Sequence, residues 1–108
     1  MKKRREVWWI NFDPSVGQEV KKKRPAIIIS NDRSNRYLKR YQVLPCSSQV
    51  RKVYPSEVVL EIDGKDSKAM ADQLTTVSEI RFVEKIGTIT EEEMKKVEEI
   101  IKIQLDLN

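Results

Sequence analysis

Two short segments carry the residues best suited to chemistry. The first, residues 17–25, reads Gly-Gln-Glu-Val-Lys-Lys-Lys-Arg-Pro and runs directly into an apolar stretch. It would hold the guanidinium of Arg24 and the carboxylate of Glu19 at the mouth of a sheet. The second, residues 45–49, places the hydroxyl of Ser47 just after another apolar stretch. The 108-residue chain has no histidine and one cysteine, so these two segments are the best candidates.

The positive charge of the chain is unevenly distributed. The formal net charge is +4, and most of the lysines and arginines lie in residues 1–52, whereas the C-terminal third is acidic to neutral. This asymmetry favours a polyanionic partner for the N-terminal half. A solvated, lysine-rich surface is the alternative explanation.

Composition excludes several classes of protein. At 39% hydrophobic and 35% charged residues, the chain is too apolar for a disordered protein and too polar for a membrane protein. Its length predicts a single domain over residues 1–108. With no histidine and only Cys46, we expect no intramolecular disulfide, no metal site and no cofactor. No apolar signal segment follows the basic start, so we expect a cytoplasmic location and no membrane contact.

Hydrophobic patterning predicts short strands followed by one helix. We expect strands over residues 7–12, 26–30, 41–44, 57–62, 67–74, 75–80 and 85–89. Pro45 should close the third strand, Asp63-Gly64 should make a hairpin turn, and residues 31–36 form a turn or a short helix. Residues 14–24 and 47–55 should be loops.

The last segment has the features of an amphipathic helix. Thr90 and Glu93 fit a capping box at its start. An apolar stripe at helical spacing follows, made of Met94, Val97, Ile101 and Leu105 and widened by Ile100, Ile103 and Leu107. We expect this stripe to pack on the sheet, with spare width for a dimer or a peptide partner. The element order predicts a mainly β, α+β fold: a small antiparallel barrel-like sheet with a C-terminal α-helix.

An ordered series of segments resembles the MazF/PemK toxins, the mRNA interferases of bacterial toxin–antitoxin pairs. Residues 7–19 read Val-Trp-Trp-Ile-Asn-Phe-Asp-Pro-Ser-Val-Gly-Gln-Glu, and residues 24–32 read Arg-Pro-Ala-Ile-Ile-Ile-Ser-Asn-Asp. Val-Leu-Pro-Cys-Ser-Ser-Gln at 43–49 and Ala-Met-Ala-Asp-Gln-Leu at 69–74 continue the series. The resemblance extends from about residue 4 to residue 107.

This resemblance implies an SH3-like antiparallel β-barrel of the CcdB/PemK type with short helices, and a homodimer. It also implies sequence-specific, metal-independent cleavage of single-stranded RNA, which leaves 2′,3′-cyclic phosphate and 5′-hydroxyl ends. A cognate, MazE-like antitoxin would block the activity. The family's key arginine falls on Arg24, its key threonine on Ser47, and a loop glutamate on Glu19.

These residue types suit such a reaction, in which RNA supplies its own 2′-hydroxyl nucleophile. Arg24 stays ionised and its planar fork matches two phosphate oxygens, so we expect it to stabilise the transition state and to protonate the leaving oxygen. Ser47 would bond a phosphate oxygen or orient the 2′-hydroxyl, unless it only caps a turn. Glu19 would accept the proton, unless it only pairs with surface lysines.

Five basic residues are expected to contact the RNA backbone: Lys21, Lys22, Lys23, Arg51 and Lys52. Aromatic side chains for base stacking include Trp8 and Trp9, but these neighbours lie on one strand, so one should face the core.

The chain departs from the family pattern at four places. Serine replaces threonine at 47, and Val-Lys-Lys-Lys replaces a glycine-containing stretch at 20–23. Arg5 replaces the glycine that often follows the first arginine, and Met70 replaces an arginine that PemK-type members pair with the equivalent of Asp72. Two alternatives therefore stay open: a non-enzymatic toxin of related fold that inhibits DNA gyrase, and a degenerate member that binds RNA or an antitoxin without turnover. Arg24 together with Ser47 favours the nuclease, because a protein-binding toxin needs neither.

Overall fold

The computed structural model describes residues 2–14, 16–19 and 22–108. Lys21, one of the expected RNA contacts, lies outside the described residues. The elements, in chain order, are β1 (Glu6–Asn11), β2 (Lys23–Ile28), α1 (Asp32–Leu38), β3 (Arg40–Ser47), β4 (Glu57–Ile62), β5 (Lys65–Met70), the 3₁₀ turn η1 (Ala71–Gln73), β6 (Thr75–Ser78), the 3₁₀ turn η2 (Glu79–Arg81), β7 (Phe82–Thr88) and α2 (Glu91–Leu105).

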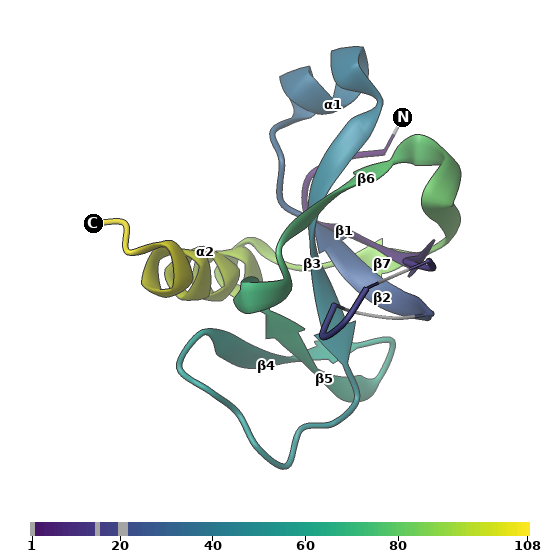
Figure 1. Cartoon of the computed structure of the whole chain (residues 1–108). Coiled ribbons are helices and arrows are strands. Elements are labelled where there is room, and N and C mark those ends of the chain that lie inside the picture. Colours follow the sequence, from purple (N-terminus) through teal and green to yellow (C-terminus); the bar gives the residue numbers. More distant parts are fainter. Residues whose placement is uncertain (1, 15, 20–21) are drawn as a thin grey trace.

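The described strands form one curled antiparallel sheet with a helix against it (Figure 1). Their order is β4-β5-β3-β2-β1-β7, and β6 pairs with β3 beside that path. Helix α2 lies against the β4–β5 end, and α1 lies at the opposite end of β3 (Figure 1). The predicted α+β fold, a small antiparallel half-barrel with a C-terminal helix, is confirmed. No helix among the described residues is long and apolar enough to cross a membrane.

Strand β3 does not end at Pro45 as predicted. It continues to Ser47 because it changes partner at this point: Pro45 lies opposite Ala26 of β2, while Cys46 and Ser47 pair with Ala69 and Lys68 of β5. Pro45, which has no N–H to donate, therefore lies where β3 stops pairing with β2 and starts pairing with β5. A strand tolerates proline at such a position. Ser47 consequently belongs to a strand and not to a loop.

Alternate residues of the central strands pack into two separate hydrophobic cores. One cluster, on the α2 face, includes Val7, Ile27 and Leu44. The other, on the opposite face, includes Ile10, Ala26, Ile28, Tyr41 and Val43. Because successive strand residues point to opposite faces, neighbours in sequence divide between the two clusters. The prediction for the paired tryptophans is confirmed: Trp8 packs against the second cluster, and Trp9 is 38% exposed.

Helix α2 begins with the expected capping box. The Thr90 hydroxyl accepts a hydrogen bond from the Glu93 amide at 3.1 Å, and the Thr90 amide donates to the Glu93 carboxylate at 2.8 Å. Met94, Val97 and Ile100 are buried against the sheet, as predicted for a core stripe. The three apolar residues of the last turn and tail are more than half exposed: Ile103, Leu105 and Leu107. Core packing therefore explains the first turns of the stripe only.

The second half of the sheet differs in detail from the prediction. The hairpin turn is confirmed, with φ of +53° at Asp63 and +76° at Gly64, as a type I′ turn requires. Instead of one strand over 67–74, β5 stops at Met70 and η1 follows. In η1 the Leu74 amide donates to the Ala71 carbonyl at 3.2 Å. Strand β7 begins at Phe82, three residues earlier than expected.

Candidate functional site

Arg24 and Ser47 lie on one face of adjacent strands. Arg24 alternates along β2 with Ala26 and Ile28, so it is on the face opposite α2. Ser47 alternates along β3 with Val43 in the same way. The ladder between the two strands ends at Ala26–Pro45. Beyond that pair Arg24 pairs with Ile10 of β1 and Ser47 pairs with Lys68 of β5, so the two side chains share a sheet face without a ladder between them.

The Ser47 hydroxyl also has a local structural partner. Ser47 is 7% exposed, and its Oγ accepts a hydrogen bond from the Gln49 amide at 3.1 Å. This bond is the turn-capping contact that was the alternative interpretation. It uses only one acceptor position of the hydroxyl, which leaves the hydroxyl hydrogen for a phosphate or ribose oxygen. The Ser47 hydroxyl can therefore cap the turn and bind a phosphate or ribose oxygen at the same time.

A cavity of about 340 Å³ is lined by both cations and anions, and its buried residues Cys46 and Ile62 belong to the α2-side core. The anions are Asp63 and Asp66. Lys22 and Lys23 line it together with Arg24, and Trp9 contributes an exposed aromatic ring. On the β3 side the lining hydroxyl is that of Ser48, which is exposed. Two of the expected RNA contacts thus line a cavity with Arg24, but its lining lies on the α2 side of the sheet and does not include Ser47.

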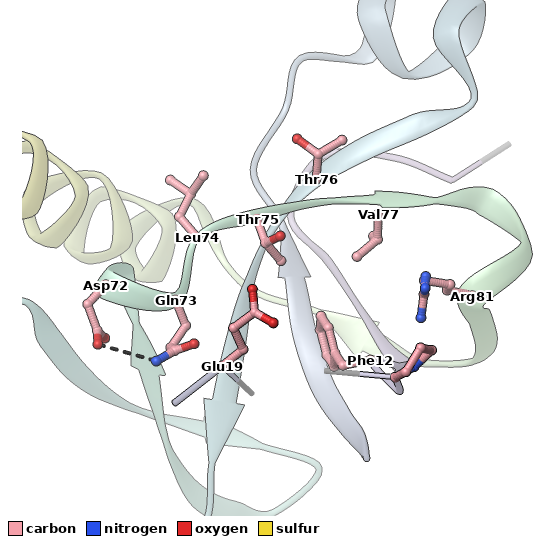
Figure 2. Close-up of a pocket in the computed structure, with 10 residues that line it drawn as sticks. Phe12, Glu19, Asp72, Gln73, Leu74, Thr75, Thr76, Val77 and Arg81 are labelled. Carbon is pink, nitrogen blue, oxygen red and sulfur yellow. Dashed lines mark hydrogen bonds between the residues drawn. The ribbon is translucent and has the colours of Figure 1, made fainter. Parts of the chain in front are cut away.

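Glu19 lies in a different cavity, of about 310 Å³, between the loop after β1 and the segment from η1 to η2 (Figure 2). Its carboxylate accepts the Val16 amide at 2.7 Å. Gln73 and Thr75 lie close to Glu19 in this cavity, whereas Arg24 is not among the lining residues (Figure 2). The structure therefore does not bring Glu19 and Arg24 into one cavity.

The remaining expected RNA contacts, Arg51 and Lys52, are exposed in the segment between β3 and β4. They line neither of the two cavities just described. The Lys52 ammonium lies 5.7 Å from the centre of the Tyr54 ring, a cation–π distance. These residues extend the basic surface beyond the cavity of Arg24.

Sequence reasoning did not assign a role to several residues around the Glu19 cavity. The Gln73 amide donates to the Gln18 carbonyl at 3.5 Å and so ties η1 to the loop. The Arg81 guanidinium donates to the carbonyls of Asn11 at 3.1 Å and Asp13 at 2.6 Å, which holds the start of that loop. Asp72 and Gln73 lie in residues 69–74, one of the segments on which the family resemblance rests. No feature of the sequence indicated a role for Arg81.

Neither thiol chemistry nor a clustered metal site is indicated by the described part of the chain. Complete burial raises the pKa of the Cys46 thiol to about 12, so the thiol stays protonated and unreactive. No group of three or more histidine, cysteine, aspartate or glutamate side chains comes together among the described residues.

Comparisons with known proteins agree on one family. The model of the PemK-like, MazF-like toxin of type II toxin–antitoxin systems matches residues 3–105. Endoribonuclease MazF9 of Mycobacterium tuberculosis is 34% identical over 116 residues, covering 99% of this chain and 98% of the relative. Endoribonuclease EndoA of Bacillus subtilis is 34% identical over 112 residues, covering 97% and 95%.

Solved structures show the same fold. MazF from Deinococcus radiodurans superposes with a TM-score of 0.88 at 24% identity and covers 98% of this chain and 97% of its own. A mycobacterial endoribonuclease in complex with its cognate antitoxin gives a TM-score of 0.83 at 18% identity, covering 100% and 98%.

Proposed function

The chain belongs to the PemK-like, MazF-like toxin family of type II toxin–antitoxin systems, and we propose that it is an endoribonuclease that cleaves single-stranded RNA. Relatives named endoribonucleases match almost its whole length. The observation that carries the proposal is the sheet face that Arg24 and Ser47 share. A guanidinium and a hydroxyl on one face suit a phosphodiester, and Lys22 and Lys23 add positive charge next to Arg24 in the chain.

In this proposal Arg24 neutralises the phosphorane that forms when the 2′-hydroxyl attacks, and it protonates the leaving 5′-oxygen. Ser47 bonds a phosphate oxygen or orients the 2′-hydroxyl. The products are a 2′,3′-cyclic phosphate and a 5′-hydroxyl, and no metal takes part. Glu19 remains the proposed proton acceptor, which requires the 2′-hydroxyl next to the phosphate held by Arg24 to come within hydrogen-bond reach of the Glu19 carboxylate. Lys21, Lys22, Lys23, Arg51 and Lys52 bind the backbone.

The biological setting follows from the family. We propose that the chain, as a single domain of residues 1–108, acts as a homodimer on cytoplasmic mRNA and is held inactive by a MazE-like antitoxin. A related fold that poisons gyrase without cutting nucleic acid is less favoured, because the aligned relatives are named endoribonucleases. A binding-only member is the alternative that an activity measurement excludes.

The test is to incubate the purified protein with mixed-sequence single-stranded RNA in EDTA and to map the new 5′ ends. We expect cleavage at a defined sequence, with 5′-hydroxyl ends. Arg24→Ala should lower the rate on the order of 10²- to 10³-fold, because one preorganised charge donor is removed. Arg33→Ala, at an exposed position of α1, is the matched control and should cleave normally.

Intact RNA with the wild-type protein would refute the nuclease. Cleavage that appears only when magnesium is added would refute the metal-independent mechanism and keep the substrate.

A further inference from the structure

A buried ion pair lies on the same sheet face as the candidate site. The Lys68 ammonium is 3.1 Å from the Glu57 carboxylate, and the two side chains are 11% and 7% exposed. Lys68 pairs with Ser47 across the β3–β5 ladder, so the two side chains share a face. Along β4, Leu60 and Ile62 point into the α2-side core, which leaves Glu57 on the opposite face with Lys68.

Four polar side chains therefore lie on the same face of four neighbouring strands: Arg24 on β2, Ser47 on β3, Lys68 on β5 and Glu57 on β4. Two of the four are the proposed catalytic groups. The other two have no role in the reaction proposed above. Their burial is costly, and a buried ion pair is often replaceable by apolar side chains without loss of stability. Stability alone is thus a weak reason for the pair.

Both members of the pair also hold the segment of residues 48–56, which connects β3 to β4. The Lys68 ammonium donates to the Lys52 carbonyl at 2.9 Å. The Glu57 carboxylate accepts the Tyr54 amide at 2.9 Å. The Tyr54 ring lies 5.9 Å from the Lys68 ammonium and 5.7 Å from the Lys52 ammonium. The pair thus fixes the backbone from which Lys52 and Arg51 project.

We propose that the Lys68–Glu57 pair is a latch that positions the 48–56 segment for RNA binding, so that Arg51 and Lys52 meet phosphates next to the one held by Arg24 and Ser47. Lys68 is a positioning residue, because its hydrogen bonds to Lys52 and Glu57 both go to protein oxygens. The inference rests on the proposed function and adds residues to that same site. It predicts that breaking the latch weakens RNA binding more than it weakens the fold.

The latch is tested with the double variant Lys68→Met/Glu57→Gln, which leaves no buried charge unpaired and keeps an acceptor for the Tyr54 amide. Binding to a mixed-sequence 2′-fluoro single-stranded RNA, which has no attacking hydroxyl, is measured by fluorescence anisotropy over a range of salt concentrations. We expect roughly tenfold weaker binding, as for the removal of a charge-assisted hydrogen bond. The slope of log Kd against log salt should fall by about 0.7 for each phosphate that the variant no longer neutralises.

Two further variants separate positioning from folding. Lys68→Arg keeps the charge and the donors and should recover part of the affinity and of the salt slope. Tyr54→Ala removes only the half-exposed ring above the ammonium groups and should weaken binding in the same direction. The matched control is Lys102→Met/Glu99→Gln, which removes an exposed ion pair on α2 and should bind RNA like the wild type.

The inference would be overturned if the latch variants that fold bound RNA with the affinity and the salt slope of the wild type. Their melting temperatures would not change this conclusion. Cleavage of ordinary RNA by the wild-type protein in the same series reports the proposed function separately. Binding without cleavage would refute the nuclease and leave the latch intact, whereas absence of RNA binding by the wild type would overturn both.

Discussion

Ser47 and Ser48 are neighbours in sequence but differ in their surroundings. Ser47 is nearly buried on the sheet face that it shares with Arg24, and Ser48 is exposed and lines the cavity of Lys22 and Lys23 on the α2 side. Sequence reasoning placed the key hydroxyl at 47 by resemblance, but it treated both serines as parts of a loop. The distinction depends on where β3 ends, which is set by pairing with β5 and is not visible in the local sequence.

Separate alanine substitutions distinguish the two hydroxyls. Ser47→Ala should lower kcat on the order of 10²-fold, because a hydroxyl fixed beside the reacting phosphate acts mainly in the transition state. Ser48→Ala should affect KM more than kcat, because an exposed cavity hydroxyl contributes to binding. Steady-state cleavage of one defined RNA gives both constants. A normal kcat for Ser47→Ala with a large drop for Ser48→Ala would assign the role to Ser48 instead.

Elements that depend on local patterns were predicted well, and those that depend on tertiary partners were not. The alternating strand over 57–62, its Asp63-Gly64 turn and the capped C-terminal helix follow from periodicity and turn chemistry. The continuation of β3 through Pro45 follows from a change of partner strand. The turn η1 follows from a chain reversal next to the sheet, where the Ala71 amide donates to the Ser56 carbonyl at 3.1 Å. Neither the continuation of β3 nor the turn η1 is indicated by the local sequence.

The capping box of α2 allows a test at this scale. Thr90→Ala removes the side-chain acceptor for the Glu93 amide and should lower the free energy of unfolding by about 1 kcal/mol. Urea denaturation measures this change. Thr88→Ala, at an exposed position near the end of β7, is the matched control and should stay close to the wild type. RNA cleavage should be unchanged in both variants, since α2 packs on the face opposite Arg24 and Ser47. An unchanged unfolding midpoint for Thr90→Ala would show that tertiary contacts alone fix the helix start.

At the scale of the molecule, the two faces of the sheet are used differently. One face carries the core beneath α2, and the other carries four polar side chains on strands β2 to β4: Arg24, Ser47, Lys68 and Glu57. The fold class followed from the order of strands and helix, and the family followed from the ordered series of segments. The sequence did not predict that Glu19 and Arg24 line different cavities. The path of the loop after β1 depends on hydrogen bonds from Arg81, which is distant in sequence.

Glu6 links distant parts of the chain and makes stability depend on pH. Burial raises the pKa of Glu6, but hydrogen bonds from Trp8 and the Lys3 amide and the nearby Lys85 ammonium outweigh it and hold the pKa below its ordinary value of 4.5. A carboxylate with a depressed folded pKa stabilises the protein above its unfolded pKa, and this contribution disappears as pH falls through the folded pKa. The decrease is therefore expected below about 4.5.

Urea unfolding of the wild type and of Glu6→Gln over this acidic range measures the effect. The free energy of unfolding should fall more steeply with acid in the wild type than in the variant. Parallel curves for the two proteins would mean that other carboxylates account for the acid sensitivity.

Strand β3 has consequences for how the protein opens locally. It pairs with β2, β5 and β6, so its backbone amides are protected from several sides. In contrast, residues 16–19, before β2, and residues 48–56, after β3, belong to no strand. Local opening is cheapest where a segment forms few backbone hydrogen bonds and buries little apolar surface. Amide hydrogen exchange at Cys46 and Ser47 should therefore require near-global unfolding, while residues 16–19 and 48–56 exchange early and are the first targets of a protease. A protease that cleaves the 48–56 segment would thus release the proposed RNA-binding residues Arg51 and Lys52 from their fixed position while the strand that holds Ser47 stays folded.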